Sequence, residues 1–203
     1  MAASGIALVG FLIAHLAGNL LIFSGKDGTA FDSYAKALES NPLLPVVEIG
    51  LGLLFVVHIA MALSVSFRNR EARSQGYAVR ASMGRRTLAS ASMLVTGLVV
   101  LVFLVVHLYD FRIGKMLGDP HPSLAAMVRE RLATPLGAGI YLVGVGALSL
   151  HLRHAVRSAF QSLGISHPRL DPALEKAGIV AAIVLGLGFA SFPFLFLIAG
   201  AGS

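Results

Sequence analysis

The chain has 203 residues, of which 56% are hydrophobic and only 13% are charged, and its mean hydropathy is +0.81. Soluble proteins carry about twice that charged fraction, so we expect an integral membrane protein. The absence of cysteine excludes disulfides, iron–sulfur clusters and thiolate or c-type haem attachment. The net charge of +6 does not indicate nucleic-acid binding, because the basic residues lie in short loops between apolar segments.

Five apolar segments are each close to the ~20 residues that a helix needs to cross the hydrocarbon core. They cover residues 4–23, 46–67, 88–109, 135–155 and 177–200. Backbone groups in lipid must bond internally, so these segments are predicted to be helices of an all-α, single transmembrane domain over residues 1–203. The first segment begins almost at Met1, so we expect a truncated or unusually short leader and no cleavable signal peptide.

The loops predict the orientation and one further helix. The second and fourth loops together carry ten basic residues, whereas the first and third share six and hold most of the acids. Basic loops stay on the cytoplasmic side, so the N-terminus is expected inside and the C-terminus outside. In the third loop, Ser123 is a good N-cap for a surface helix over residues 124–132, which we interpret as a lid on the outer face.

Four histidines lie inside the first four segments, one from each: His15, His58, His107 and His151. A further one, His154, lies at the end of the fourth segment. Ionisable residues inside a membrane are costly and usually functional, and four of them are harder to explain as interhelical hydrogen bonds than one would be. His15 and His58 are 43 residues apart, and His107 and His151 are 44 apart. Residues 11–16 (FLIAHL) also match residues 103–108 (FLVVHL). The spacing and this match indicate a duplicated helical hairpin.

The alternating direction of the segments predicts how the histidines pair. We expect His15 with His107 on the outer side (the outer pair) and His58 with His151 on the inner side (the inner pair). The predicted segment ends place the members of a pair at depths that differ by up to about 10 Å, which tilt or longer helices must absorb. Two pairs of imidazoles suit two six-coordinate haems, which transfer electrons and leave no open iron position.

Small residues could give a flat macrocycle room between the helices, although close helix packing explains them equally well. These residues are Gly10, Gly18, Gly50, Gly52, Gly97, Gly144, Gly146 and Ala147.

His154 competes with His151, because it lies one turn later on the same helix face. It is a possible ligand, a possible partner of a haem propionate together with Arg157, or a solvated interfacial residue. We favour His151 as the ligand, because it lies further inside the predicted segment.

At this point the chain resembles a known family, the cytochrome b558-type membrane anchor of succinate dehydrogenases and fumarate reductases. The resemblance covers nearly the whole chain and rests on four motifs: residues 10–19 (GFLIAHLAGN), 57–59 (VHI), 106–112 (VHLYDFR) and 150–164 (LHLRHAVRSAFQSLG). It implies five helices and two b-type haems, with the family's ligating histidines at His15, His58, His107 and His151.

The same resemblance implies the partners and the location. A flavoprotein subunit and an iron–sulfur subunit would bind on the cytoplasmic face of a bacterial inner membrane, docked on the basic loops. The succinate chemistry would belong to the partners, and this chain would be the electron-transfer subunit. The whole complex could form a higher oligomer, and no nucleic acid is expected.

The resemblance also implies quinone, either menaquinone or ubiquinone, as the redox substrate. Quinone reduction consumes protons, and a carboxylate after the first helix could supply them: Glu39, Asp32 or Glu48. Any one of these acids is more simply a solvated loop residue. An inner site near Ser64, Arg68 and His154 is an equal alternative.

Two other functions compete with this interpretation. The first is the cytochrome b subunit of a hydrogenase, formate dehydrogenase or nitrate reductase, against which the GN context at residues 18–19 and the FQSLG context at residues 160–164 argue. The second is a haem-free transporter or scaffold, which would need polar residues along a path and broken helices at mid-membrane.

Overall fold

The computed structural model describes residues 1–71, 88–118, 123–165 and 167–201, and over these residues the chain is helical without strands. Five helices are long and apolar enough to cross a membrane, so the chain is a multi-pass membrane protein. The expected all-α architecture with five spans is therefore confirmed. The spanning helices are α1 (Ala2–Leu20), α3 (Leu44–Glu71), α4 (Leu88–His107), α7 (Pro135–Ser162) and α8 (Asp171–Ala201).

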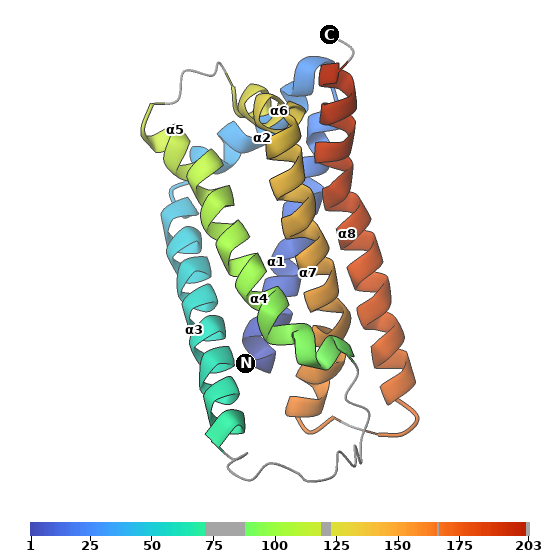
Figure 1. Ribbon diagram of the computed structural model, residues 1–203. Helices are drawn as coiled ribbons and strands as arrows, with labels where there is room; N and C mark the ends of the chain where they lie inside the picture. The colour runs from blue at the N-terminus through green and yellow to red at the C-terminus, as the bar shows by residue number, and fades with distance from the viewer. Residues whose placement is uncertain (72–87, 119–122, 166, 202–203) are drawn as a thin grey trace.

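The five long helices run along one another, and the N- and C-termini lie at opposite ends of the bundle (Figure 1). Three short helices gather at the end that carries the C-terminus, and we call this the cap end. They are α2 (Thr29–Glu39), α5 (Gly114–Met116) and α6 (Leu124–Ala133). The opposite end of the bundle is called the far end.

Two spanning helices continue about two turns past the predicted C-terminal ends of their segments. The α4 segment continues through a π-helical turn at Leu108–Ile113 and α5 to Met116, beyond the predicted end at residue 109. Helix α7 continues to Ser162, beyond the predicted end at residue 155. The added turns carry charged side chains that find partners on neighbouring elements, for example Arg112, whose Nη2 lies 2.8 Å from Oε2 of Glu48. Paired charges allow a helix to extend past the hydrocarbon region, which an apolar pattern does not detect.

Helix α2 occupies a segment that the apolar pattern assigned to a loop. The chain leaves α1 through Gly25 and Gly28, whose φ angles of 78° and 77° lie in the region that favours glycine. Helix α2 then buries Phe31, which belongs to the hydrophobic core. Its stability comes from this packing rather than from length or hydropathy, so composition alone could not predict it.

Helix α6 begins where the sequence predicts, after an N-cap at Ser123 whose Oγ accepts a hydrogen bond from Ala126 N at 3.2 Å. A second acceptor comes from α2, because Asp32 Oδ1 accepts from Ala125 N at 2.9 Å. Helix α6 is more than a surface lid, since four of its side chains are buried. They are Ala125, Met127, Val128 and Leu132.

Helix α7 packs between α4 and α8, and small residues allow the close approach. A Cβ added at Gly144 of α7 would lie only 2.3 Å from the Phe103 ring of α4. Helix α3 is the opposite case, because none of its most apolar 18-residue window is buried, against 39% for α7. The bundle therefore has a tightly packed side around α7 and a loosely packed side at α3.

We expect Gly144→Ala to destabilise the bundle by about 1–3 kcal/mol, because overpacking outweighs the gain in helix propensity. The matched control is Gly146→Ala on the same helix, where an added Cβ meets nothing within 4 Å. Unfolding of both variants in detergent should show a loss for the first and no loss for the second. Equal stability of the two variants would contradict the close α4–α7 contact.

Candidate functional site

The outer pair comes together in the half of the bundle nearer the cap end. The rings of His15 on α1 and His107 on α4 have centroids 5.8 Å apart, with an angle of 89° between their planes. An imidazole nitrogen binds a first-row metal at about 2 Å, so two axial rings on one ion have centroids on the order of 6 Å apart. The observed separation fits two rings that would hold one haem iron between them.

Aromatic side chains surround the outer pair. Phe11 stacks on His15 at 5.3 Å, and Phe189 of α8 lies 5.9 Å from the same ring. Around His107 the ring centroids of three residues lie within 6.0 Å: Phe103, Phe111 and Tyr141. Phe11 and Phe103 each precede their histidine by four residues, so the helical i, i+4 spacing was the signal that could have identified them.

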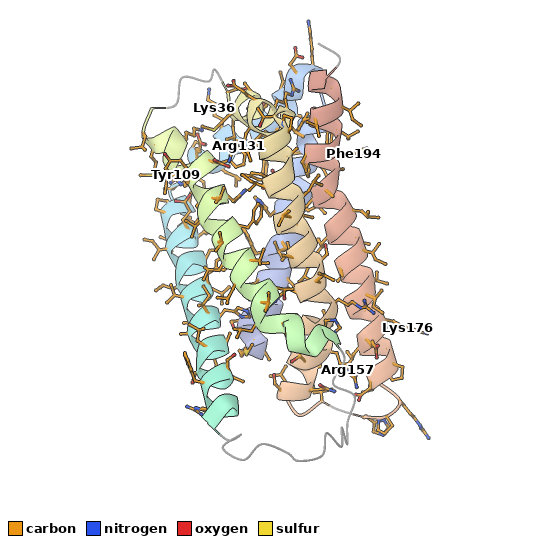
Figure 2. All side chains as sticks on the ribbon, viewed as in Figure 1. Lys36, Tyr109, Arg131, Arg157, Lys176 and Phe194 are labelled. Atoms are coloured by element: carbon orange, nitrogen blue, oxygen red, sulfur yellow. The ribbon has the colours of Figure 1, made fainter. Side chains whose placement is uncertain are left out.

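A chain of polar groups lies behind His107. The Tyr141 hydroxyl is 3.5 Å from His107 Nδ1 and donates to Asp110 Oδ2 at 3.1 Å. Arg131 Nε of α6 donates to the same oxygen at 2.7 Å, and Arg131 lies at the cap end in Figure 2. The Asp110 side chain is only 12% exposed, so Arg131 compensates a charge that is largely removed from water. The sequence interpretation counted Asp110 and Arg131 only as loop charges and did not use Tyr141.

The inner pair is held by hydroxyl groups. Ser4 Oγ of α1 lies 3.2 Å from His58 Nδ1 of α3, and Thr96 Oγ1 of α4 lies 3.4 Å from His151 Nδ1 of α7. Both rings are partly buried. His58 and His151 thus lie on the two helices that return from the cap end, each beside a hydroxyl of the preceding spanning helix.

His154 lies one turn beyond His151 and faces different neighbours. It interacts with Glu175 of α8, whereas His151 contacts Thr96 of α4. His154 Nε2 and Arg157 Nε are buried and have no hydrogen-bond partner among the described residues. Two such groups, one of them always a donor, suit an anionic group such as a haem propionate, whereas the neighbours of His151 suit a ligand.

The real lengths of the helices remove the expected mismatch in depth. His107 lies nine residues before the end of the helical segment at Met116, and His151 lies eleven before the end of α7. The predicted boundaries placed both histidines near a helix end. In the structure, both lie well inside their helical segments. The rings of His15 and His107 lie level enough to touch.

The glycines expected to make room for a macrocycle have different surroundings. Gly97 borders His151, with an added Cβ only 3.3 Å from Cε1. Gly18 and Gly144 instead meet the Tyr34 and Phe103 rings and serve helix packing. An added Cβ meets nothing within 4 Å at the remaining four positions, which are Gly10, Gly50, Gly52 and Gly146.

The candidate carboxylates for quinone chemistry fall into two groups. Glu39 and Glu48 line an open pocket of about 410 Å³ at the cap end, where they pair with Lys115 and Arg112. Asp32 is absent from the lining of this pocket and caps α6.

The alternative inner site is more dispersed in the structure. Ser64 and Arg68 are exposed on the last turns of α3, and His154 lies on α7. Among the described residues, no cluster of three or more His, Asp or Glu side chains could hold a bare metal ion.

Fold and site together define a multi-pass helical membrane protein with four histidines in its spanning helices, of which His15 and His107 lie in ring contact. The chain is 27% identical over 183 residues to a protein of Bacillus subtilis (strain 168), the succinate dehydrogenase cytochrome b558 subunit. The alignment covers 89% of this chain and 84% of that relative. No family model matches the chain, and no solved structure matches it.

We expect Arg131→Ala to lower the free energy of unfolding by about 2–3 kcal/mol, because it leaves the Asp110 carboxylate largely buried without its ion-pair partner. The control is Lys115→Ala, which breaks an ion pair with Glu39 in which both side chains are more than 40% exposed. That change should cost no more than about 1 kcal/mol. Unfolding in detergent tests both, and an equal loss would contradict the buried role of Asp110.

Proposed function

We propose that this chain is the di-haem cytochrome b membrane anchor of a succinate:quinone oxidoreductase. The observation that carries the proposal is the ring contact between His15 and His107, which come from two spanning helices. The other two interior histidines, His58 and His151, lie on the two returning helices. Similarity to a succinate dehydrogenase cytochrome b558 subunit over most of the chain supports the same role.

His15 and His107 would ligate one haem b, and His58 and His151 the other. When bound, the two haems supply one-electron transfer between the iron–sulfur subunit and quinone. The aromatic residues around the outer pair exclude water and hold the two rings in place. His154 Nε2 and Arg157 Nε, which lack partners, would receive a propionate near the inner pair.

The far end would face the cytoplasm, with the N-terminus inside. Basic residues gather there, and Figure 2 places Arg157 and Lys176 at this end. The iron–sulfur and flavoprotein subunits would dock on this face of a bacterial inner membrane. Of the arginines in the second loop, Arg68 is exposed at the end of α3. The other arginines of this loop lie outside the residues whose side chains the structure describes. They are Arg70, Arg73, Arg80, Arg85 and Arg86.

The pocket at the cap end would receive the quinone head group. Its volume of about 410 Å³ is within the usual range for small-molecule sites. Glu39 and Glu48 would relay protons between the head group and the outer water, while Lys115 and Arg112 hold these carboxylates in place.

The purified protein should be red, with b-type bands in the reduced-minus-oxidised spectrum and two haems per chain by pyridine haemochrome assay. Mass spectrometry of co-purifying proteins should find a flavoprotein and an iron–sulfur subunit. Hydrogenase, formate dehydrogenase or nitrate reductase subunits there would select the other oxidoreductase class. A colourless preparation from haem-replete cells would overturn the proposal in favour of a transporter or scaffold.

Replacement of single histidines tests the pairing. We expect His15→Ala and His107→Ala to remove mainly one haem, and His58→Ala and His151→Ala mainly the other, because each haem needs both axial ligands. His167→Ala, at an exposed histidine between α7 and α8, is the control and should keep both haems. The haem content and the spectrum of each variant measure this. Loss of the same haem from His15→Ala and His58→Ala would show that the pairing is wrong.

Carboxylate variants test the quinone site. Glu39→Gln or Glu48→Gln should lower quinone-linked turnover by about 100-fold if that side chain relays protons. Asp32→Asn is the control, because it keeps an acceptor oxygen for Ala125 N and should leave turnover within about two-fold. Unchanged turnover in both glutamate variants would leave the inner site near Ser64, Arg68 and His154.

A further inference from the structure

The same hydroxyl–glycine pair occurs in α1 and α4. Ser4-Gly5 lies eleven residues before His15, and Thr96-Gly97 lies eleven residues before His107. The two pairs are 92 residues apart, as are the two histidines of the outer pair. The pairs thus occupy equivalent positions in the two helical hairpins. Each pair lies about one and a half helical turns before Phe11 or Phe103, the first aromatic residue that contacts the outer pair.

Each pair faces a histidine of the inner pair rather than of the outer pair. Ser4 Oγ lies 3.2 Å from His58 Nδ1, and Thr96 Oγ1 lies 3.4 Å from His151 Nδ1. In both hairpins the first spanning helix therefore supports the histidine of the returning helix.

The hydroxyl protons determine the direction of these contacts. Ser4 Oγ donates to the carbonyl of Met1 at 2.8 Å, and Thr96 Oγ1 donates to the carbonyl of Met93 at 3.1 Å. A hydroxyl has one proton, so only its lone pairs remain for the imidazole. Each oxygen must accept a hydrogen bond from Nδ1–H, which places the proton of the neutral ring on Nδ1. Nε2 then carries the free lone pair that a metal ion needs.

The glycines provide space beside the same rings. A Cβ added at Gly5 would lie 3.6 Å from His58 Cε1, and one added at Gly97 would lie 3.3 Å from His151 Cε1. The first distance is ordinary contact and the second is tight, so any longer side chain at either position would push the ring. Each hydroxyl–glycine pair therefore both directs the ring and makes room for it.

The outer pair lacks this arrangement. An amide nitrogen of Asn19 lies 3.3 Å from His15 Nδ1, and the Tyr141 hydroxyl lies 3.5 Å from His107 Nδ1. Asn19 shares its helix with His15, and Tyr141 is part of the chain that ends at Arg131. The hydroxyl–glycine pairs are thus specific to the inner pair.

We infer that Ser4-Gly5 and Thr96-Gly97 are matched positioning elements for the inner haem, which hold His58 and His151 as Nδ1–H tautomers with Nε2 directed at the iron. The inference rests on the proposed function, since it needs a haem between these rings. A hydrogen bond from Nδ1–H makes the imidazole a more basic ligand and so favours oxidised iron.

The test uses the full chain, co-expressed with its partner subunits, and compares Ser4→Ala and Thr96→Val with the unaltered protein. Removal of either acceptor should raise the midpoint potential of the inner haem and weaken haem retention by about ten-fold. The EPR signal of that low-spin haem should also shift, because its axial ring is less constrained. The outer haem should keep its potential and its signal. Preparations of His58→Ala and His15→Ala assign each signal to one site.

Three comparisons separate positioning from a general structural effect. Ser4→Thr and Thr96→Ser retain the hydroxyl and should behave as the unaltered protein. Ser149→Ala removes a hydroxyl of α7 that donates to the Val145 carbonyl and, within the described part of the chain, has no other hydrogen bond. It should leave both haems unchanged. Gly97→Leu should lose the inner haem first, because its side chain must displace the His151 ring.

The outcomes separate this inference from the proposed function. If the unaltered protein contained no haem, the proposed function itself would be wrong. An unaltered protein with two haems, whose potentials and EPR signals do not change in Ser4→Ala and Thr96→Val, would overturn the positioning role alone. A change confined to the outer haem would overturn it as well.

Discussion

The interior of this bundle depends on how imidazole nitrogens are satisfied where water is scarce. An unpaired polar group in such surroundings costs roughly 1–3 kcal/mol. Each of the four interior histidines has a polar side chain within 3.5 Å of its Nδ1: Ser4, Asn19, Thr96 and Tyr141. Three of these partners come from a different helix than the histidine they contact. The histidines therefore fix the relative positions of α1 and α3 and of α4 and α7, in addition to any cofactor that they bind.

The duplicated hairpin extends beyond the histidine spacing that first indicated it. Each hairpin has a spanning helix, a short helix at the cap end and a returning helix: α1, α2 and α3 in one, and α4, α6 and α7 in the other. The two short helices contact each other through Asp32 and the N-terminus of α6. Helix α8 has no counterpart, and it packs on α7 and supplies Phe189 to the outer pair. The fifth span thus contributes an aromatic ring to the surroundings of the outer pair.

Several features of the molecule could be predicted from the sequence because they follow from hydropathy. The five spans and the interior position of the four histidines depend only on apolar length and on the cost of a polar group in lipid. Helix α2 could not be predicted this way, because its stability comes from Phe31 packing against distant residues. The ends of α4 and α7 were misplaced for a related reason, since their last turns are stabilised by ion pairs with other elements. The chain from Tyr141 to Arg131 joins three separate helical segments, and no local pattern records it.

Helix α3 shows how a bound haem would matter for the fold as well as for the proposed electron transfer. Its most apolar window contains no buried residue, and its polar links to the bundle are few among the described residues. Ser4 meets His58 in the membrane interior, and Glu48 meets Arg112 at the cap end. The Met1 amino group also donates to Met61 Sδ. A group bound between His58 and His151 would join the returning helices of both hairpins at mid-bundle. Binding energy that favours only the folded state adds directly to its stability. The inner haem would therefore hold α3 against the bundle, where side-chain packing alone leaves it loosely attached.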